Sequence, residues 1–284
     1  MVRIIGLLAL AAGLAACSTV KLAYDNLDDI AYWWMDSYVD FSDVQAARVR
    51  ADLTRLHRWH RRQELPQISA LLNAIEQMAP GDISAAQVCG FEQAVRARID
   101  AVTGQGEGAV VSLAMSLAPE QLAYLERKFE RVNRDYTNDW LRLEPAAMRD
   151  KRFDKMVERF EMVYGSLDEK QKAALRTEID RSVFEPRRLY VEQRRRQQDL
   201  LRTLRQIVGQ SLPAAEAGSL LRAYLQRAQE SPDAVYRAYQ QALVHDICAI
   251  TSAVHNSTAA PQREVAARRL RAWQRDLKEL AAQP

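Results

Sequence analysis

Residues 22–62 read LAYDNLDDIAYWWMDSYVDFSDVQAARVRADLTRLHRWHRR, and the spacing of their apolar side chains decides the fold. In the first half, apolar residues recur at intervals of three and four positions: Tyr24, Leu27, Ala31, Trp34, Tyr38 and Phe41. Because an α-helix repeats every 3.6 residues, this spacing places all six on one helix face. We therefore expect a helix over residues 22–40 that packs through a coiled-coil-like seam.

Opposite charges occupy the two halves of this stretch. The first half carries acidic residues outside the seam: Asp25, Asp28, Asp29, Asp36, Asp40 and Asp43. The second half carries six arginines: Arg48, Arg50, Arg55, Arg58, Arg61 and Arg62. A turn at 41–43 then predicts an antiparallel helix pair with complementary faces, in which each exposed ion pair contributes at most about 1 kcal/mol. The alternative is an acidic, aromatic surface, including Trp33 and Trp34, that stacks a sugar or a peptide.

The rest of the chain keeps the helical period between its prolines. We expect helices at 43–64, 66–79, 85–103, 109–116, 119–143, 146–164, 169–184, 187–209, 214–230, 233–256 and 262–281. The predicted fold class is therefore all-α, a multi-helix bundle or stacked antiparallel helices with no sheet. Gly104, Gly106 and Gly108 predict a flexible break, at which the helical domain could subdivide near 104–108.

Composition sets the broad class of the protein. The 284 residues are 48% hydrophobic and 27% charged, which excludes a disordered chain. No apolar run reaches the roughly 20 residues that a membrane-spanning helix needs. The 40 Lys and Arg nearly balance the 37 Asp and Glu, so bulk charge does not predict nucleic-acid binding.

The first 17 residues, MVRIIGLLALAAGLAAC, have the pattern of an export signal: one basic residue, an apolar core and small residues before a cysteine. Leu14-Ala15-Ala16-Cys17 resembles the bacterial lipobox. That resemblance implies that residues 1–16 are removed, that Cys17 carries lipid (palmitate among its acyl chains), and that residues 17–284 form a periplasmic helical domain. Ser18 favours the outer membrane. The alternatives are an ordinary secretory signal and an N-terminal core helix.

Two cysteines remain, Cys89 and Cys248. In an oxidising compartment an even number of thiols favours a disulfide, which would bring two helices far apart in sequence into contact. The alternative is two separate buried thiols, since free cysteine is a common small core residue.

One motif recurs at four expected helix starts: Phe41-Ser42-Asp43-Val44-Gln45, Ile83-Ser84-Ala85-Ala86-Gln87, Leu117-Ala118-Pro119-Glu120-Gln121 and Leu167-Asp168-Glu169-Lys170-Gln171. It has the form of a capping box, in which glutamine at the third helical position reaches back to the cap. It also resembles the L-T-x-x-Q signature of small periplasmic stress chaperones, although capping alone accounts for it.

One cluster could carry acid–base chemistry. His60 and Glu64 are one helical turn apart, and we consider them as an acid–base pair with Asp36, Trp34 and Arg61 around them. The alternative is a half-buried, hydrogen-bonded structural histidine. We expect no metal, since His245 and His255 are the only histidines outside residues 57–60, and no cofactor.

The arginine-rich segment 185–205 is a second candidate site, one that would act through its charge. Arg188, Arg195 and Arg202 each follow an acid by three positions, as in a solvent-exposed face of helical ion pairs. The alternative is a patch that binds anionic lipid or glycan.

The lipobox, residues 22–41 and WHRRQELP at 59–66 together resemble an uncharacterised family of helical bacterial lipoproteins. The resemblance implies localisation and fold but no activity. With no catalytic motif in the chain, we expect a non-enzymatic binding or chaperone-like envelope protein. The alternative is an envelope enzyme that acts on glycan or lipid through His60 and Glu64.

Overall fold

The computed structural model describes residues 21–283, which are helical throughout apart from short connections. After a helical turn at residues 21–25, the helices are α2 (Leu27–Val39), α3 (Asp43–Met78), α4 (Ala85–Cys89), α5 (Phe91–Met115), α6 (Pro119–Tyr136), the π-helical η1 (Thr137–Leu141), α7 (Pro145–Tyr164), α8 (Glu169–Arg181), α9 (Pro186–Gln210), α10 (Ala214–Gln229), α11 (Ala234–Ser257) and α12 (Ala260–Ala282). The all-α prediction is confirmed for this range. No helix within it is both long and apolar enough to span a bilayer. Cys17 and the lipobox lie outside the described residues.

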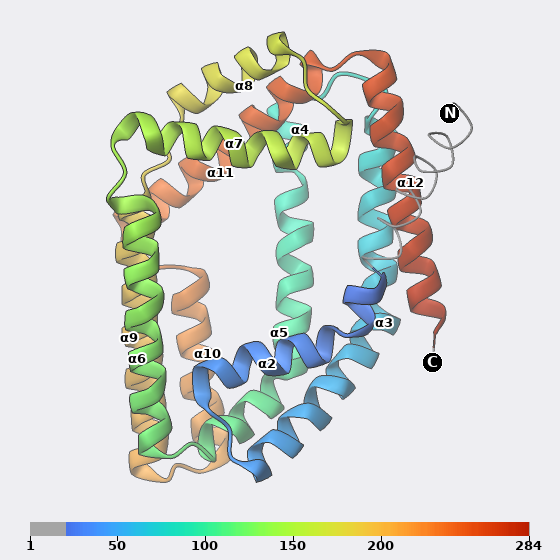
Figure 1. Ribbon diagram of the computed structural model, residues 1–284. Helices are drawn as coiled ribbons and strands as arrows, with labels where there is room; N and C mark the ends of the chain where they lie inside the picture. The colour runs from blue at the N-terminus through green and yellow to red at the C-terminus, as the bar shows by residue number, and fades with distance from the viewer. Residues whose placement is uncertain (1–20, 284) are drawn as a thin grey trace, which may run out of the picture.

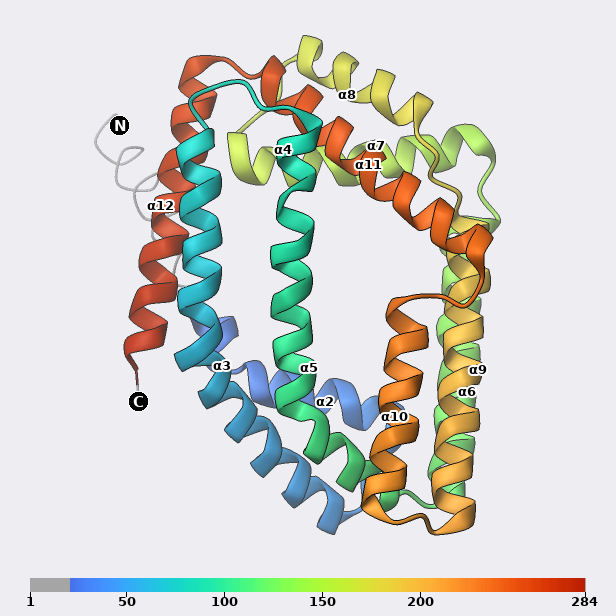
Figure 2. The ribbon, with the colours of Figure 1, turned by 180° about the vertical axis from the view of Figure 1, so that it is seen from behind.

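The helices form an open frame with two separate cores (Figure 1 and Figure 2). The first core joins α5, α6, α9 and α10, around buried residues such as Leu122, Leu204 and Ile207. The second core joins α7, α8, α11 and α12, around Leu175, Ile250 and neighbouring residues. The long helix α3 connects the two regions, because it packs against α2 and α5 and also against α12.

Pro66 lies inside α3 and does not end it. Proline lacks the amide hydrogen and its ring crowds the preceding turn, so an interior proline bends a helix. Figure 2 shows α3 changing direction between its lower and upper parts. The boundary expected between 64 and 66 is therefore a bend in one helix, which lets α3 meet α2 at one end and α12 at the other.

The break expected at Gly104, Gly106 and Gly108 is wrong, because α5 runs unbroken from Phe91 to Met115. The interruption falls instead at Gly90, between α4 and α5. Glycine lowers helix propensity by only about 1 kcal/mol per residue, which tertiary contacts can outweigh. Here α5 packs against α3 on one side and α10 on another.

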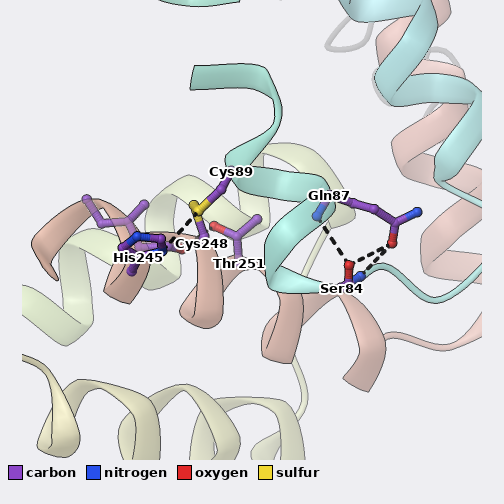
Figure 3. The surroundings of a disulfide bond; sticks show 7 residues. Ser84, Gln87, Cys89, His245, Cys248 and Thr251 are labelled. Atoms are coloured by element: carbon purple, nitrogen blue, oxygen red, sulfur yellow. Dashed lines mark hydrogen bonds between the residues drawn. A yellow bond between two sulfur atoms is a disulfide. The ribbon is translucent and has the colours of Figure 1, made fainter. Parts of the chain in front are cut away.

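A disulfide joins Cys89 at the end of α4 to Cys248 in α11, with the two Cα atoms 5.6 Å apart and 159 positions between the residues (Figure 3). The bond holds the short helix α4 against α11, with which it also makes most of its helix contacts. In the chain-entropy model a loop of this length restrains the unfolded chain by about 5 kcal/mol.

The glycines of α5 provide a stability test. A Cβ added at Gly104 or Gly108 would have no neighbour within 4 Å, and both residues are helical. We therefore expect Gly104→Ala/Gly108→Ala to raise the free energy of unfolding by about 1–2 kcal/mol, measured by urea denaturation. Gly165, which ends α7 at φ 80°, is the matched control: Gly165→Ala must destabilise, because alanine is strained there. A loss of stability in the α5 double variant would contradict this account.

Candidate functional site

Helix α2 presents an exposed aromatic face. Trp33 and Trp34 are each 62% exposed, Ile30 is 52% and Leu27 is 41% exposed. At 100° per residue these four side chains cover about one third of the helix circumference. Figure 1 shows α2 on the near side of the molecule, across α5. Monomeric proteins seldom leave several large apolar side chains contiguous and exposed without a binding role.

The predicted seam is wrong at Leu27 and Trp34, which are both exposed. The buried aromatic residue of α2 is Tyr32, at 6% exposure, with the Arg50 guanidinium 3.5 Å from its ring centre and the tilted ring of Phe41 5.9 Å away. Trp34 turns outward, and its ring lies tilted against the ring of Tyr38, with 4.8 Å between the ring centres. The helix therefore lies on α3 through a face next to the predicted one, and this rotation leaves the tryptophans in solvent.

Acidic groups flank this face, and some of them pair with α3 as the antiparallel arrangement predicts. Asp29 accepts a hydrogen bond from Arg50 at 2.8 Å, and Asp25 accepts one from Arg61 at 2.9 Å. Asp36 accepts from the backbone N–H of Phe41 at 2.9 Å and so caps the turn after α2. The complementary-face hypothesis is thus confirmed at these pairs.

His60 belongs to an anchoring cluster at the other end of α2. Its Nδ1 lies 2.9 Å from the hydroxyl of Tyr24, whose ring also packs edge-on against His57 at 4.8 Å. Burial lowers the pKa of both histidines, so both rings favour the neutral form. Burial also raises the pKa of Tyr24 to about 12. These contacts fasten residues 21–28 to α3.

The proposed acid–base site does not assemble in one place. Glu64 is buried, its nearest cation being Arg98 at 3.4 Å, and Arg61 bonds Asp25 and Gln283. Asp36 and Trp34 lie at the opposite end of α2, beside the start of α3. With about 1.5 Å of rise per residue, that end is about 25 Å from His60 along α3. Only three of the five proposed site residues lie close together: His60, Arg61 and Glu64. Each of these three bonds a partner that holds the fold together, and Asp36 and Trp34 lie elsewhere.

Two pairs of capping glutamines form what we call glutamine clasps. In the first, Gln45 of α3 and Gln121 of α6 exchange two amide hydrogen bonds, 3.1 and 2.7 Å. Each side-chain oxygen also accepts the N–H of its own helix cap, Ser42 or Ala118. Each amide nitrogen donates to the carbonyl five residues before the other glutamine, Ser116 for Gln45 and Asp40 for Gln121.

The second clasp repeats this pattern between α8 and α12. Gln171 and Gln262 exchange hydrogen bonds of 2.6 and 3.0 Å, and their oxygens accept from the cap N–H groups of Asp168 and Ala259. Their nitrogens donate to Ser257 and Ser166, again five residues before the opposite glutamine. A glutamine amide can make four hydrogen bonds, and all four are made in every case. Gln45 and Gln171 are buried.

The four glutamines of the predicted capping boxes, Gln45, Gln87, Gln121 and Gln171, each accept the backbone N–H of their helix cap. The reciprocal bond to the cap side chain is made at Ser42, Ser84 and Asp168 but not at Ala118, which has no side-chain oxygen. Sequence reasoning missed the fifth, Gln262, which follows Thr258-Ala259-Ala260-Pro261. Its signal was a proline in the first turn with glutamine at the third helical position, as in the Gln121 copy. Gln87 caps α4 alone (Figure 3).

The three predicted ion pairs of α9 are present, Glu185–Arg188, Glu192–Arg195 and Asp199–Arg202, at 2.5–3.3 Å. The expectation that they lie on an outer face is wrong for two of them, because Glu192 and Asp199 are buried. Asp199 takes a two-point contact from Arg227 of α10, at 2.9 and 3.1 Å. Burial raises the pKa of both carboxyls, but hydrogen bonds from arginines outweigh it and leave both below their usual values.

These partners decide what the arginines of α9 can offer a ligand. Arg195 donates to Glu192 and to the carbonyl of Arg227, so it joins α9 to α10. Arg202 and Arg188 are more exposed but face Asp199 and Glu185. Arg188, Arg195 and Arg202 are therefore each already paired with a carboxylate within the fold. Among the described residues, no group of acidic, histidine and cysteine side chains is arranged to hold a metal ion.

The clasp yields a matched pair of tests. Gln171→Glu removes both amide donors and buries a carboxylate against the carbonyl of Ser257 and Oε1 of Gln262. We expect it to lower the free energy of unfolding by at least about 2–3 kcal/mol. Gln87→Glu keeps the capping box and adds a favourable charge at a helix start, so its effect should stay within about 0.5 kcal/mol. Equal effects in the two variants, measured by denaturant unfolding, would show that the clasp adds nothing to capping.

Comparison with known proteins places the chain in a family without a described activity. No curated protein and no solved structure matches the sequence. A family model described as a family of unknown function, DUF6279, matches residues 37–212, from the end of α2 to the end of α9. That range includes the first clasp and the buried carboxylates of α9. The match covers more than half of the sequence, so the chain belongs to the DUF6279 family.

Proposed function

We propose that this protein is a bacterial lipoprotein, anchored through Cys17 to the outer membrane and facing the periplasm. The support is the lipobox-like sequence before Cys17 and the disulfide of the folded domain, a bond typical of oxidising compartments. Two or more acyl chains on one cysteine suffice for stable anchoring.

The anchor has a direct test. Cys17→Ala in the full chain should abolish incorporation of labelled palmitate and move the protein from the membrane fraction to the soluble envelope fraction. Cys89→Ala, which removes a different thiol, is the control and should leave labelling intact. Palmitate labelling that persists in Cys17→Ala would refute the anchor.

We further propose that the folded domain is a non-enzymatic, chaperone-like binder of polypeptide. The observation that carries this proposal is the α2 face of Leu27, Ile30, Trp33 and Trp34, exposed beside acidic residues. Tryptophan is among the residues that contribute most at binding surfaces. The sequence between Lys21 and Arg48 contains no Lys or Arg, so the charged side chains that α2 itself carries are all acidic. Arg50 of α3, 5.2 Å from the centre of the Trp33 ring, pairs with one of them, Asp29. An extended segment with apolar and basic side chains complements this surface.

Two features of the chain agree with this function. The capping motif, now seen as paired clasps, resembles the signature of small periplasmic stress chaperones. The residues of the acid–base alternative are separated, and Arg188, Arg195 and Arg202 are already paired, so neither set gives comparable support for an enzyme or an anionic-ligand protein.

The binding test uses an unstructured fluorescent peptide of Leu, Phe and Lys and its counterpart with Glu in place of Lys. We expect saturable binding of the Lys peptide, weaker binding of the Glu peptide, and at least a tenfold loss of affinity in Trp33→Ser/Trp34→Ser, followed by fluorescence anisotropy. Val191→Ser/Val235→Ser is the control, since these valines are 62% and 67% exposed on α9 and α11. Binding that the tryptophan variant leaves unchanged, or no binding of either peptide, would overturn the proposal.

A further inference from the structure

An apolar cavity of about 360 Å³ lies between the upper part of α3 and the helices around the second core. Its walls come from α3, the α3–α4 connection, α4, α5, α7, α11 and α12, and include Leu72, Ile75, Met78, Val88, Phe91, Phe160, Val163, Leu270 and Trp273. Binding cavities for small molecules are typically roughly 300–1,000 Å³. The cavity therefore has room for a small ligand.

Three polar side chains in the wall, those of Tyr164, Thr251 and His255, direct their hydrogen-bond donors to other groups of the protein. His255 lies with Nε2 2.7 Å from the carbonyl of Gly81, and that nitrogen must donate because a carbonyl only accepts. Burial lowers the pKa of His255, so the ring is neutral and Nδ1 accepts from the hydroxyl of Tyr164 at 2.8 Å. Thr251 donates to the carbonyl of Ile247, one turn back in α11. The donors of these three residues are therefore not available to an occupant of the cavity.

This chemistry selects the class of occupant. A sugar, nucleotide or peptide would bury its polar groups without partners, at a cost of about 1–3 kcal/mol for each group. Water is disfavoured for the same reason, and dry apolar cavities bind hydrocarbon. The residues of α3 and α12 in the wall span 72–79 and 266–273, about 10 Å along each helix. The cavity therefore suits an elongated hydrocarbon.

We propose that this cavity binds the acyl chain of a single-chain lipid. Ile75 in the wall is 38% exposed, which places an opening to solvent at this residue and leaves the polar head of the lipid outside. The disulfide next to Val88 and Phe91 fixes the α4 wall to α11, so the cavity exists before the ligand arrives. A preformed site loses less conformational entropy on binding.

The spectroscopic test exploits Trp273 in the wall. The probes are dodecanoate and 12-bromododecanoate, with lysophosphatidylcholine of the same chain length as the phospholipid form. We expect saturable one-to-one binding by titration calorimetry and quenching of tryptophan fluorescence by the brominated chain. Trp273→Phe should still bind dodecanoate but lose most of the quenching. Binding of the fatty acid alone or of the lysolipid alone supports the site and identifies the source of the chain.

The occupancy test fills the cavity. Val163→Trp should lower the affinity for dodecanoate at least tenfold, while Val191→Trp on the exposed face of α9 should leave it unchanged. Circular dichroism and an intact disulfide establish that each variant is folded. If Val163→Trp does not fold, the quenching measured in Trp273→Phe tests the site independently. The proposal is overturned if neither lipid binds saturably. It is equally overturned if full quenching persists in Trp273→Phe, since the chain would then lie near another tryptophan such as Trp33 or Trp34.

Discussion

The paired capping glutamine is the interaction on which the arrangement of this frame depends. A single glutamine side chain makes four hydrogen bonds. It accepts from the cap N–H of its own helix, donates to a carbonyl in a distant part of the chain, and both accepts from and donates to the amide of the partner glutamine. Each helix start is thereby bound to another helix start 76 or 91 positions away. Helix capping is usually a local device. In this chain capping also fixes which helices pack together and which of their ends are joined.

The clasps explain how a protein with two separate cores keeps its shape. One clasp lies at the start of α6 beside the first core, and the other at the start of α8 beside the second. Leu117 and Leu167, which precede the caps of α6 and α8, are both buried in these cores. The glutamine clasps and the two apolar cores therefore meet at the starts of the same two helices. The buried carboxylates of α9 act similarly, since Asp199 and Glu192 hold α10 and the following loop through Arg227 and Ser231.

Much of the fold was predictable, because apolar period, prolines and capping residues are local signals. The starts of α3, α6, α8 and α12 fall within two residues of those expected. The errors arose where tertiary contacts decide. The glycines of α5 are helical because α3 and α10 pack on either side of that helix. Gln87 and Gln171 share one sequence pattern, yet one caps its own helix alone and the other joins a clasp.

The candidate site was harder to predict for the same reason. Tyr32, Trp33 and Trp34 are consecutive aromatics, and only the position of Arg50 and Phe41 shows that Tyr32 is the buried one. His60 and Glu64 have the spacing of an acid–base pair, but Tyr24 and Arg98 approach them from distant segments. The apolar cavity had no signature at all, since its walls come from six helices and a connecting segment.

The disulfide also imposes an order in time. Cys89 leaves the ribosome 159 residues before Cys248, on the order of 10 s at ordinary rates of synthesis. During that interval the only other thiol in the chain is Cys17. Lipid on the sulfur of Cys17, as proposed, would remove that competitor, so that the waiting thiol of Cys89 could pair within its own chain only with Cys248. The anchor and the covalent closure of the fold would then be successive steps of one maturation pathway.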